Sequence, residues 1–120
     1  MILWLDHTQR LNLHALIGAQ RATVDDMRMY WRVQDTIDLS NEEREIIGYQ
    51  VREQNGQRQI AWESTRGLAP KEFEFTSDEI QKLHNMIRTW QSGYMIGADR
   101  IWLEPLLGQL ENGASHGAAK

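Results

Sequence analysis

The feature that most constrains this chain is an Asn-Gly pair at residues 55–56, set between two segments that alternate apolar and polar residues. Asparagine followed by glycine supplies the two positive-φ positions of a type I′ turn, which joins antiparallel strands through a two-residue loop. Counting outward from the turn places Val51 opposite Ile60 and Tyr49 opposite Trp62 on one face. A slip of one residue would turn this apolar set toward water, so turn and pattern predict the same β-hairpin. Because an isolated hairpin is only marginally stable, we expect a third strand or a helix to cover its apolar face.

Two downstream segments are candidates for that cover. The run at 71–75, KEFEF, alternates charge with phenylalanine, which predicts an edge strand with both phenylalanines on one side. Thr76 and Glu79 follow as a capping box, and apolar residues then recur every three or four positions as far as Trp90. We expect the strand to join the hairpin in one sheet and the helix, ended by Gly93, to cover that sheet.

Three further helices are predicted in the amino-terminal half. The first spans 8–17, the second starts after the N-cap Thr23 and ends near Asp38, and a brief third starts at the Ser40 capping box and stops at Gly48. The first two carry apolar residues at helical spacing, and Ile46 and Ile47 give the third an apolar side to bury.

The carboxyl end predicts one more helix and a tail. Glu104 and Pro105 suit an N-cap followed by a first-turn proline, which predicts a final short helix through Leu110. From Asn112 onward the chain lacks large apolar residues, so we expect 112–120 to be a disordered tail. The expected architecture is a single α+β domain over residues 1–111. Its small antiparallel sheet, the Asn-Gly hairpin plus one further strand, packs against four to five short helices.

Length and composition exclude several classes of protein. A chain of 120 residues is the size of one domain, and the absence of cysteine excludes disulfides and cysteine-based zinc sites. No apolar run approaches the roughly 18 residues that a membrane span requires, and the amino end lacks the basic region of a secretory signal. We therefore expect a cytoplasmic protein with no membrane association.

No segment of the chain carries a motif typical of catalysis. The histidines, His7, His14, His84 and His116, follow no metal-binding spacing, and glycine-rich phosphate loops are missing. Three carboxylate pairs occur, Asp25-Asp26, Glu42-Glu43 and Asp78-Glu79. Each falls in the first turn of a predicted helix, where negative charge complements the helix dipole. We therefore predict a non-enzymatic protein with no metal and no cofactor.

The candidate contact residues are arginines and tryptophans. Arg21, Arg28 and Arg32 can line one face of the second predicted helix. Local ion pairs on a solvated face explain these arginines better than a phosphate site, because the chain is acidic with a net charge of −4. Direct nucleic-acid binding is therefore disfavoured, and the same arginines can meet an acidic protein partner.

The five tryptophans divide into two groups. Trp31, Trp62 and Trp90 fall on the apolar faces of their predicted elements and are expected in the core. Trp4 and Trp102 lie near the termini, where two interpretations stay open. They pack on each other, or they form an exposed patch for a partner or a second copy of the chain.

The order of these features resembles small uncharacterised proteins of bacteriophages and prophages. The resemblance spans Thr8 to Leu110 and is carried by the 39–43 cap LSNEE, the hairpin that ends in Ala61-Trp62, the KEFEF strand and the 102–106 segment WLEPL. No activity is assigned to that group, so no site residue follows from it. The resemblance implies a phage-derived protein acting in a bacterial cytoplasm or in a virion.

Three functions remain open, in this order of preference. The first is a non-enzymatic protein–protein interaction module, such as a phage inhibitor of host defence machinery, with a host or phage protein as its partner. An acidic surface of this kind can occlude the nucleic-acid groove of its target. The second is a virion or tail-assembly component that acts by self-association as a homo-oligomer. The third is an enzyme whose site is assembled from residues without a motif.

Overall fold

The computed structural model describes residues 1–63 and 69–118, and the side chains of Gln54 and of residues 113–118 lie outside that description. Within it the helices are α1 (His7–Gly18), α2 (Val24–Ile37), α3 (Asn41–Ile46), α4 (Ser77–Arg88) and α5 (Arg100–Ala118). The strands are β1 (Ile2–Leu5), β2 (Gln50–Gln54), β3 (Gln57–Ala61) and β4 (Lys71–Glu74). Helices combined with small antiparallel sheets make an α+β fold, which confirms the predicted class.

The helix starts form where local side chains can satisfy the first backbone amides. In α1, α3 and α4 the N-cap residue and the residue three positions later each accept a hydrogen bond from the other's backbone N–H. These reciprocal pairs are Asp6/Gln9, Ser40/Glu43 and Thr76/Glu79. Helix α2 starts after Thr23, whose side chain accepts from the backbone N–H of Asp26. The predicted caps Thr23, Ser40 and Thr76 are confirmed, and the three carboxylate pairs lie in the first turns of α2, α3 and α4.

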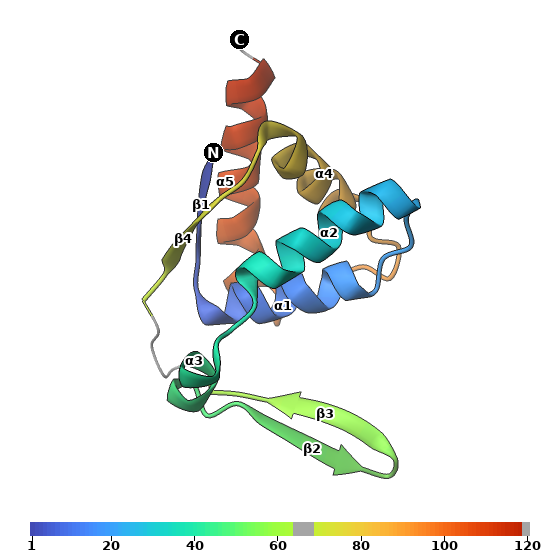
Figure 1. Ribbon diagram of the computed structural model, residues 1–120, viewed down its shortest axis with the longest axis vertical. Helices are drawn as coiled ribbons and strands as arrows, with labels where there is room; N and C mark the ends of the chain where they lie inside the picture. The colour runs from blue at the N-terminus through green and yellow to red at the C-terminus, as the bar shows by residue number, and fades with distance from the viewer. Residues whose placement is uncertain (64–68, 119–120) are drawn as a thin grey trace.

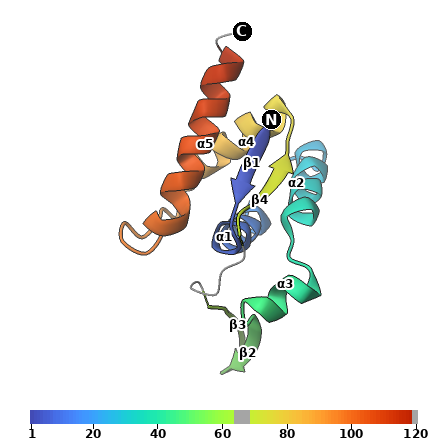
Figure 2. The same cartoon turned by 90° about the vertical axis from the view of Figure 1, so that its left-hand side faces the viewer.

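The sheet in the body of the molecule pairs β1 with β4, which come from opposite halves of the chain (Figure 2). Leu3 lies opposite Phe73, and the ladder is extended by Met1, whose backbone nitrogen and oxygen each bond Phe75 at 2.8 Å. Alternate side chains along this ladder, Leu3 and Leu5 of β1, Phe73 of β4 and the adjacent Phe75, are buried. This inward face joins apolar residues of α1, α2, α4 and α5 in one core.

The hairpin β2–β3 forms as predicted but stands apart from that sheet (Figure 1). Asn55 and Gly56 have φ values of 55° and 78°, and Val51 lies opposite Ile60. The prediction that KEFEF would be the hairpin's third strand is wrong, since β4 pairs with β1 instead. The physical reason is that Ile2–Leu5 is itself a strand with alternating burial, and its inward leucines join Phe73 of β4 and the adjacent Phe75 in the core.

The predicted cover over the hairpin is wrong for the same reason. Helix α4 packs on α5, and its apolar stripe, which includes Ile80 and Leu83, joins the core beside Phe73. Among the described elements, β2 and β3 contact mainly each other. As a result Val51 and Ile60 remain 46% and 53% exposed.

The last helix starts earlier than predicted. Helix α5 begins at Arg100, so Pro105 lies inside it rather than in its first turn. Asp99 explains the earlier start, because its carbonyl accepts from the N–H of Leu103 and its carboxylate accepts from the indole N–H of Trp102. The backbone of α5 continues to Ala118, past the predicted end at Leu110. The division into a domain over 1–111 and a disordered tail over 112–120 stays a prediction.

The tryptophans are distributed differently from the sequence-based expectation. Trp102 is 5% exposed and belongs to the core, whereas Trp31, expected in the core, is 51% exposed. Helix α2 buries only Val33 and Ile37 fully, so its apolar stripe is wider than the surface that covers it. Trp62 and Trp90 are half-buried.

Candidate interaction surfaces

The first candidate surface is the apolar face of the hairpin, which projects from the body of the molecule (Figure 1). Val51 and Ile60 lie opposite each other near its middle and are about half exposed. Tyr49 and Trp62, at the base, are half-buried. A recess of about 390 Å³ lies where β3 approaches the body, and it is lined in part by Ile60, Trp62 and Ile101. The hairpin therefore presents an apolar ladder beside a shallow hollow.

The base of the hairpin is tied to the body through α3. The N–H of Tyr49 donates to the carbonyl of Arg44 at 2.9 Å, and the N–H of Glu63 donates to the carbonyl of Ile47 at 2.9 Å. The guanidinium of Arg44 also lies over the Tyr49 ring, 5.2 Å from its centroid. Because Ile47 is fully buried, these contacts fix the root of the hairpin to a packed residue.

Helix α3 is held in turn by a buried arginine of α1. Arg10 is 3% exposed and donates to the carbonyls of Ile37 and Asp38, at the carboxyl end of α2, and to both carboxylate oxygens of Glu43. The shorter bond to Glu43 is 2.6 Å. The hydrogen bond from Arg10, together with bonds from Ser40, lowers the pKa of Glu43 to about 2. This network is structural, and it places the hairpin relative to the core.

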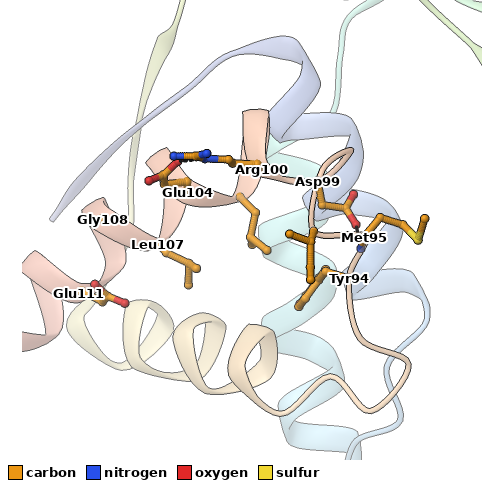
Figure 3. A pocket seen from close by; sticks show the side chains of 10 residues that line it. Tyr94, Met95, Asp99, Arg100, Glu104, Leu107, Gly108 and Glu111 are labelled. Atoms are coloured by element: carbon orange, nitrogen blue, oxygen red, sulfur yellow. Dashed lines mark hydrogen bonds and ion pairs between the residues drawn. The ribbon is translucent and has the colours of Figure 1, made fainter.

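The second candidate surface is a groove of about 550 Å³ along α5 (Figure 3). One wall is the connector that carries Tyr94, Met95 and Ile96, and the other is the face of α5 that carries Leu103 and Leu107. The apolar side chains of the connector are among the most exposed in the described residues, with Met95 at 69% and Ile96 at 95%. Charged residues of α5 line the same groove: Arg100, Glu104 and Glu111.

The connector is held in place by hydrogen bonds. The hydroxyl of Tyr94 donates to the carbonyl of Ile87 at 2.9 Å, and burial raises the pKa of that hydroxyl. The N–H of Met95 donates to the carboxylate of Asp99 at 2.7 Å. On α5, Arg100 donates to Glu104 at 2.8 Å, and this bond lowers the pKa of Glu104. The groove is thus an ordered apolar trough with a paired charge at one end.

The predicted arginine stripe is divided in the structure. Arg21 precedes α2 and lines a separate polar cavity of about 500 Å³ beside α4, while Arg28 is exposed on α2. Arg32 donates at 2.6 Å to the buried carboxylate of Glu79. The ion pairs of α2 therefore run to another helix rather than along its own face. Lys82 makes a second such pair with Asp26 at 2.7 Å, and that bond raises the pKa of the lysine.

The two terminal tryptophans lie in different environments. Trp102 packs edge-on against Tyr94 inside the core, with ring centroids 6.1 Å apart, and is not at the surface. Trp4 is 53% exposed on the outer face of β1. Its backbone N–H and carbonyl both bond the side-chain amide of Gln109, at 2.7 and 2.8 Å, so α5 caps the free edge of β1. The two do not share an exposed patch.

The α5 groove was missed by sequence reasoning. The sequence does contain a signal for this groove. Leu103 and Leu107 are four residues apart, so they share one face of a helix that starts at Arg100, and the apolar pair Met95-Ile96 lies shortly before that helix. Among the described side chains, those of residues 1–53, 55–63 and 69–112, no group of three or more His, Asp or Glu is placed to hold a metal ion. Across that same part of the chain, no helix has the length and apolarity that crossing a bilayer requires.

Comparisons with protein-family models, curated proteins and solved structures find no match for this chain. The resemblance to phage proteins therefore stays an expectation.

Proposed function

We propose that this chain is a non-enzymatic protein-binding module whose main contact element is the β2–β3 hairpin. The observation that carries the proposal is the exposed apolar pair Val51 and Ile60, which lies beside the recess at the hairpin base. A two-stranded hairpin is only marginally stable alone, and no other described element of this chain packs over its apolar face. A partner that packs on this face would therefore stabilise the hairpin.

The residues around the pair fit an interface. Aromatic side chains are enriched at binding hot spots, and Tyr49 and Trp62 lie on the same face, half-buried at the base. Covering apolar surface is worth about 25 cal/mol per Å² before the costs of association are subtracted. In addition, β2 and β3 each have one edge with no neighbouring strand in the described sheet, and a partner strand can hydrogen-bond there.

The carboxylates support a binding function over catalysis, because the paired ones serve as caps and ion-pair partners. Glu43 holds Arg10, Glu79 holds Arg32, and Asp26 holds Lys82. The narrower proposal, inhibition of host machinery by a phage-encoded protein in a bacterial cytoplasm, rests on the resemblance. The net charge of −4 fits a target whose own ligand is a polyanion.

The experiment is affinity capture from bacterial lysate with three versions of the chain. One is unchanged. The second carries Val51→Thr and Ile60→Thr, which keep β-branched side chains and remove apolar surface. The third carries Arg52→Thr and Gln59→Thr, the cross-strand pair on the opposite face, as a matched control. We expect one stoichiometric partner with the unchanged chain and the control, and its loss with the apolar-face variant. Equal capture by all three versions, or no partner, contradicts the proposal.

Self-association is the second candidate function, favoured by the α5 groove. The order of residues that line this groove supports one specific pairing of two copies.

A further inference from the structure

We propose that the α5 groove is an interface between two copies of this chain, with the two α5 helices packed antiparallel about a two-fold axis. The inference does not rest on the hairpin function, because the groove and the exposed pair Val51 and Ile60 involve different elements. It rests on the exposed apolar connector, on the order of charges along α5 and on the gap at Gly108.

The exposed apolar residues of the α5 groove indicate that another protein surface binds there. Met95 and Ile96 are largely exposed, and half-buried Tyr94, Leu103 and Leu107 form the trough beneath them. Contiguous exposed apolar side chains rimmed by charge are typical of protein interaction sites. Because these residues lie on one connector and one helix face, a second helix laid along the groove contacts all of them.

A second copy fits because the lining of α5 is complementary to itself. In an antiparallel pair centred between residues 105 and 106, Arg100 faces Glu111 of the second copy. In the same register Leu103 faces Gly108 and Glu104 faces Leu107 of the second copy. All six of these residues line the groove. An isologous two-fold contact requires that the same patch match itself when reversed, and a single register satisfies all three pairs.

The charged ends of the register are free to pair. Arg100 uses its Nε to donate to Glu104, and the guanidinium fork carries further N–H donors for a second carboxylate. Arg100 and Glu104 are exposed, at 74% and 66% of their side-chain surface. Figure 3 shows Glu111 farther along α5 than Gly108, away from the Arg100 end. Reversal of the helix brings positive to negative at both ends of the contact.

The middle of the register has room for close approach. A Cβ built on Gly108 would meet no atom within 4 Å, so the helix surface is open there. In the proposed register the Leu103 side chain of the second copy fills this opening, as a knob enters a hole. Glu104 lies opposite Leu107 with its carboxylate drawn toward Arg100, which leaves its methylene groups to pack.

The expected dimer is weak. The contact from Arg100 to Glu111 covers about 17 Å of helix, given a rise of about 1.5 Å per residue. With the connector it reaches only the small end of specific interfaces, near 1,000 Å² in total. We therefore expect a dissociation constant in the micromolar range.

Sedimentation equilibrium of the purified chain, from about 1 to about 300 µM, tests the proposal. The charge-reversal series is made in a Glu104→Gln background, which removes the intrahelical repulsion that Arg100→Glu would otherwise create. In that background Arg100→Glu alone and Glu111→Arg alone each place like charges opposite one another, and the combination restores opposite charges. We expect each single reversal to weaken the dimer about tenfold and the combination to return it to within about threefold of the background.

Gly108→Leu tests the proposed contact sterically, because its side chain occupies the space that Leu103 of the second copy would fill. A Cβ at this position meets open space in the monomer, and leucine favours a helix more than glycine does. At low concentration we therefore expect the helical circular dichroism spectrum to be kept and the melting temperature to be equal to or above that of the unchanged chain, while the dimer is lost. A monomer throughout the concentration range overturns the proposal. A dimer that is insensitive to the single reversals, or one that the combination does not restore, also overturns it.

Discussion

Removing the carboxylate of Glu43 should destabilise the protein in a pH-dependent way. This carboxylate accepts two hydrogen bonds from the guanidinium of Arg10, which is 3% exposed. In Glu43→Gln the guanidinium stays buried with one weaker acceptor. Charge-assisted hydrogen bonds contribute about 1.5–3 kcal/mol, so we expect the free energy of unfolding at pH 7 to fall by about 2 kcal/mol.

The pH dependence follows from the pKa of Glu43, which lies at about 2 against an ordinary value of 4.5. A group whose pKa is lower in the folded state stabilises the fold fully above its unfolded pKa. That contribution is lost as the pH falls from 4.5 toward 2. At about 1.4 kcal/mol per tenfold change, the contribution is about 3 kcal/mol at most, and about 2 kcal/mol of it is lost between pH 7 and pH 3. The side chain is 20% exposed, so this is an upper bound.

The assay is urea denaturation of both proteins at pH 7 and at pH 3. We expect the difference in unfolding free energy between wild type and Glu43→Gln to shrink by most of its pH 7 value. Glu42→Gln removes an exposed carboxylate from the same helical turn and is the control. A difference of equal size at both pH values would refute the argument, because the paired carboxylate would then have no special titration.

Three further predictions concern the body and the hairpin. Gln109→Leu should lower the free energy of unfolding, measured by urea denaturation, by about 1 kcal/mol, because the free edge of β1 at Trp4 loses both of its hydrogen bonds. Gln109→Glu keeps the acceptor and should lower it by less. His7→Phe should leave the urea midpoint unchanged or raise it, since His7 is 3% exposed and neither ring nitrogen has a hydrogen-bond partner. A decrease of more than about 1 kcal/mol in the free energy of unfolding would contradict the view that the His7 ring contributes only packing. Backbone amides of residues 50–61 should exchange with solvent at a lower opening free energy than those of α1 in hydrogen-exchange NMR, and equal protection would show that the hairpin unfolds only with the core.

Local features of this fold were predictable because their causes lie within a few residues. The Asn55-Gly56 turn sets the hairpin register by its own backbone conformation, and the predicted capping boxes need only side chains three residues apart. These signals require no tertiary contact.

The non-local features were not predictable in the same way. Strand Ile2–Leu5 has four residues and no turn signal, and its partner β4 lies in the other half of the chain. Pro105 suits a helix start by propensity, yet Asp99 and the burial of Trp102 start the helix a turn earlier. Both outcomes are decided by packing rather than by local sequence.

The candidate surfaces show the same division. The alternating pattern predicts the apolar face of the hairpin, but that face is exposed only because β4 pairs with β1 rather than with the hairpin. The α5 groove depends on the placement of the connector at Met95 and Ile96 against the helix, which the spacing of Leu103 and Leu107 alone does not predict.

The most direct test of the binding function is hydrogen exchange, followed by mass spectrometry, on the chain alone and in complex with its captured partner. The account predicts that protection on binding is concentrated at residues 50–61, with the core helices unchanged. Protection confined to other elements, with the hairpin amides exchanging as fast as in the free chain, would contradict it.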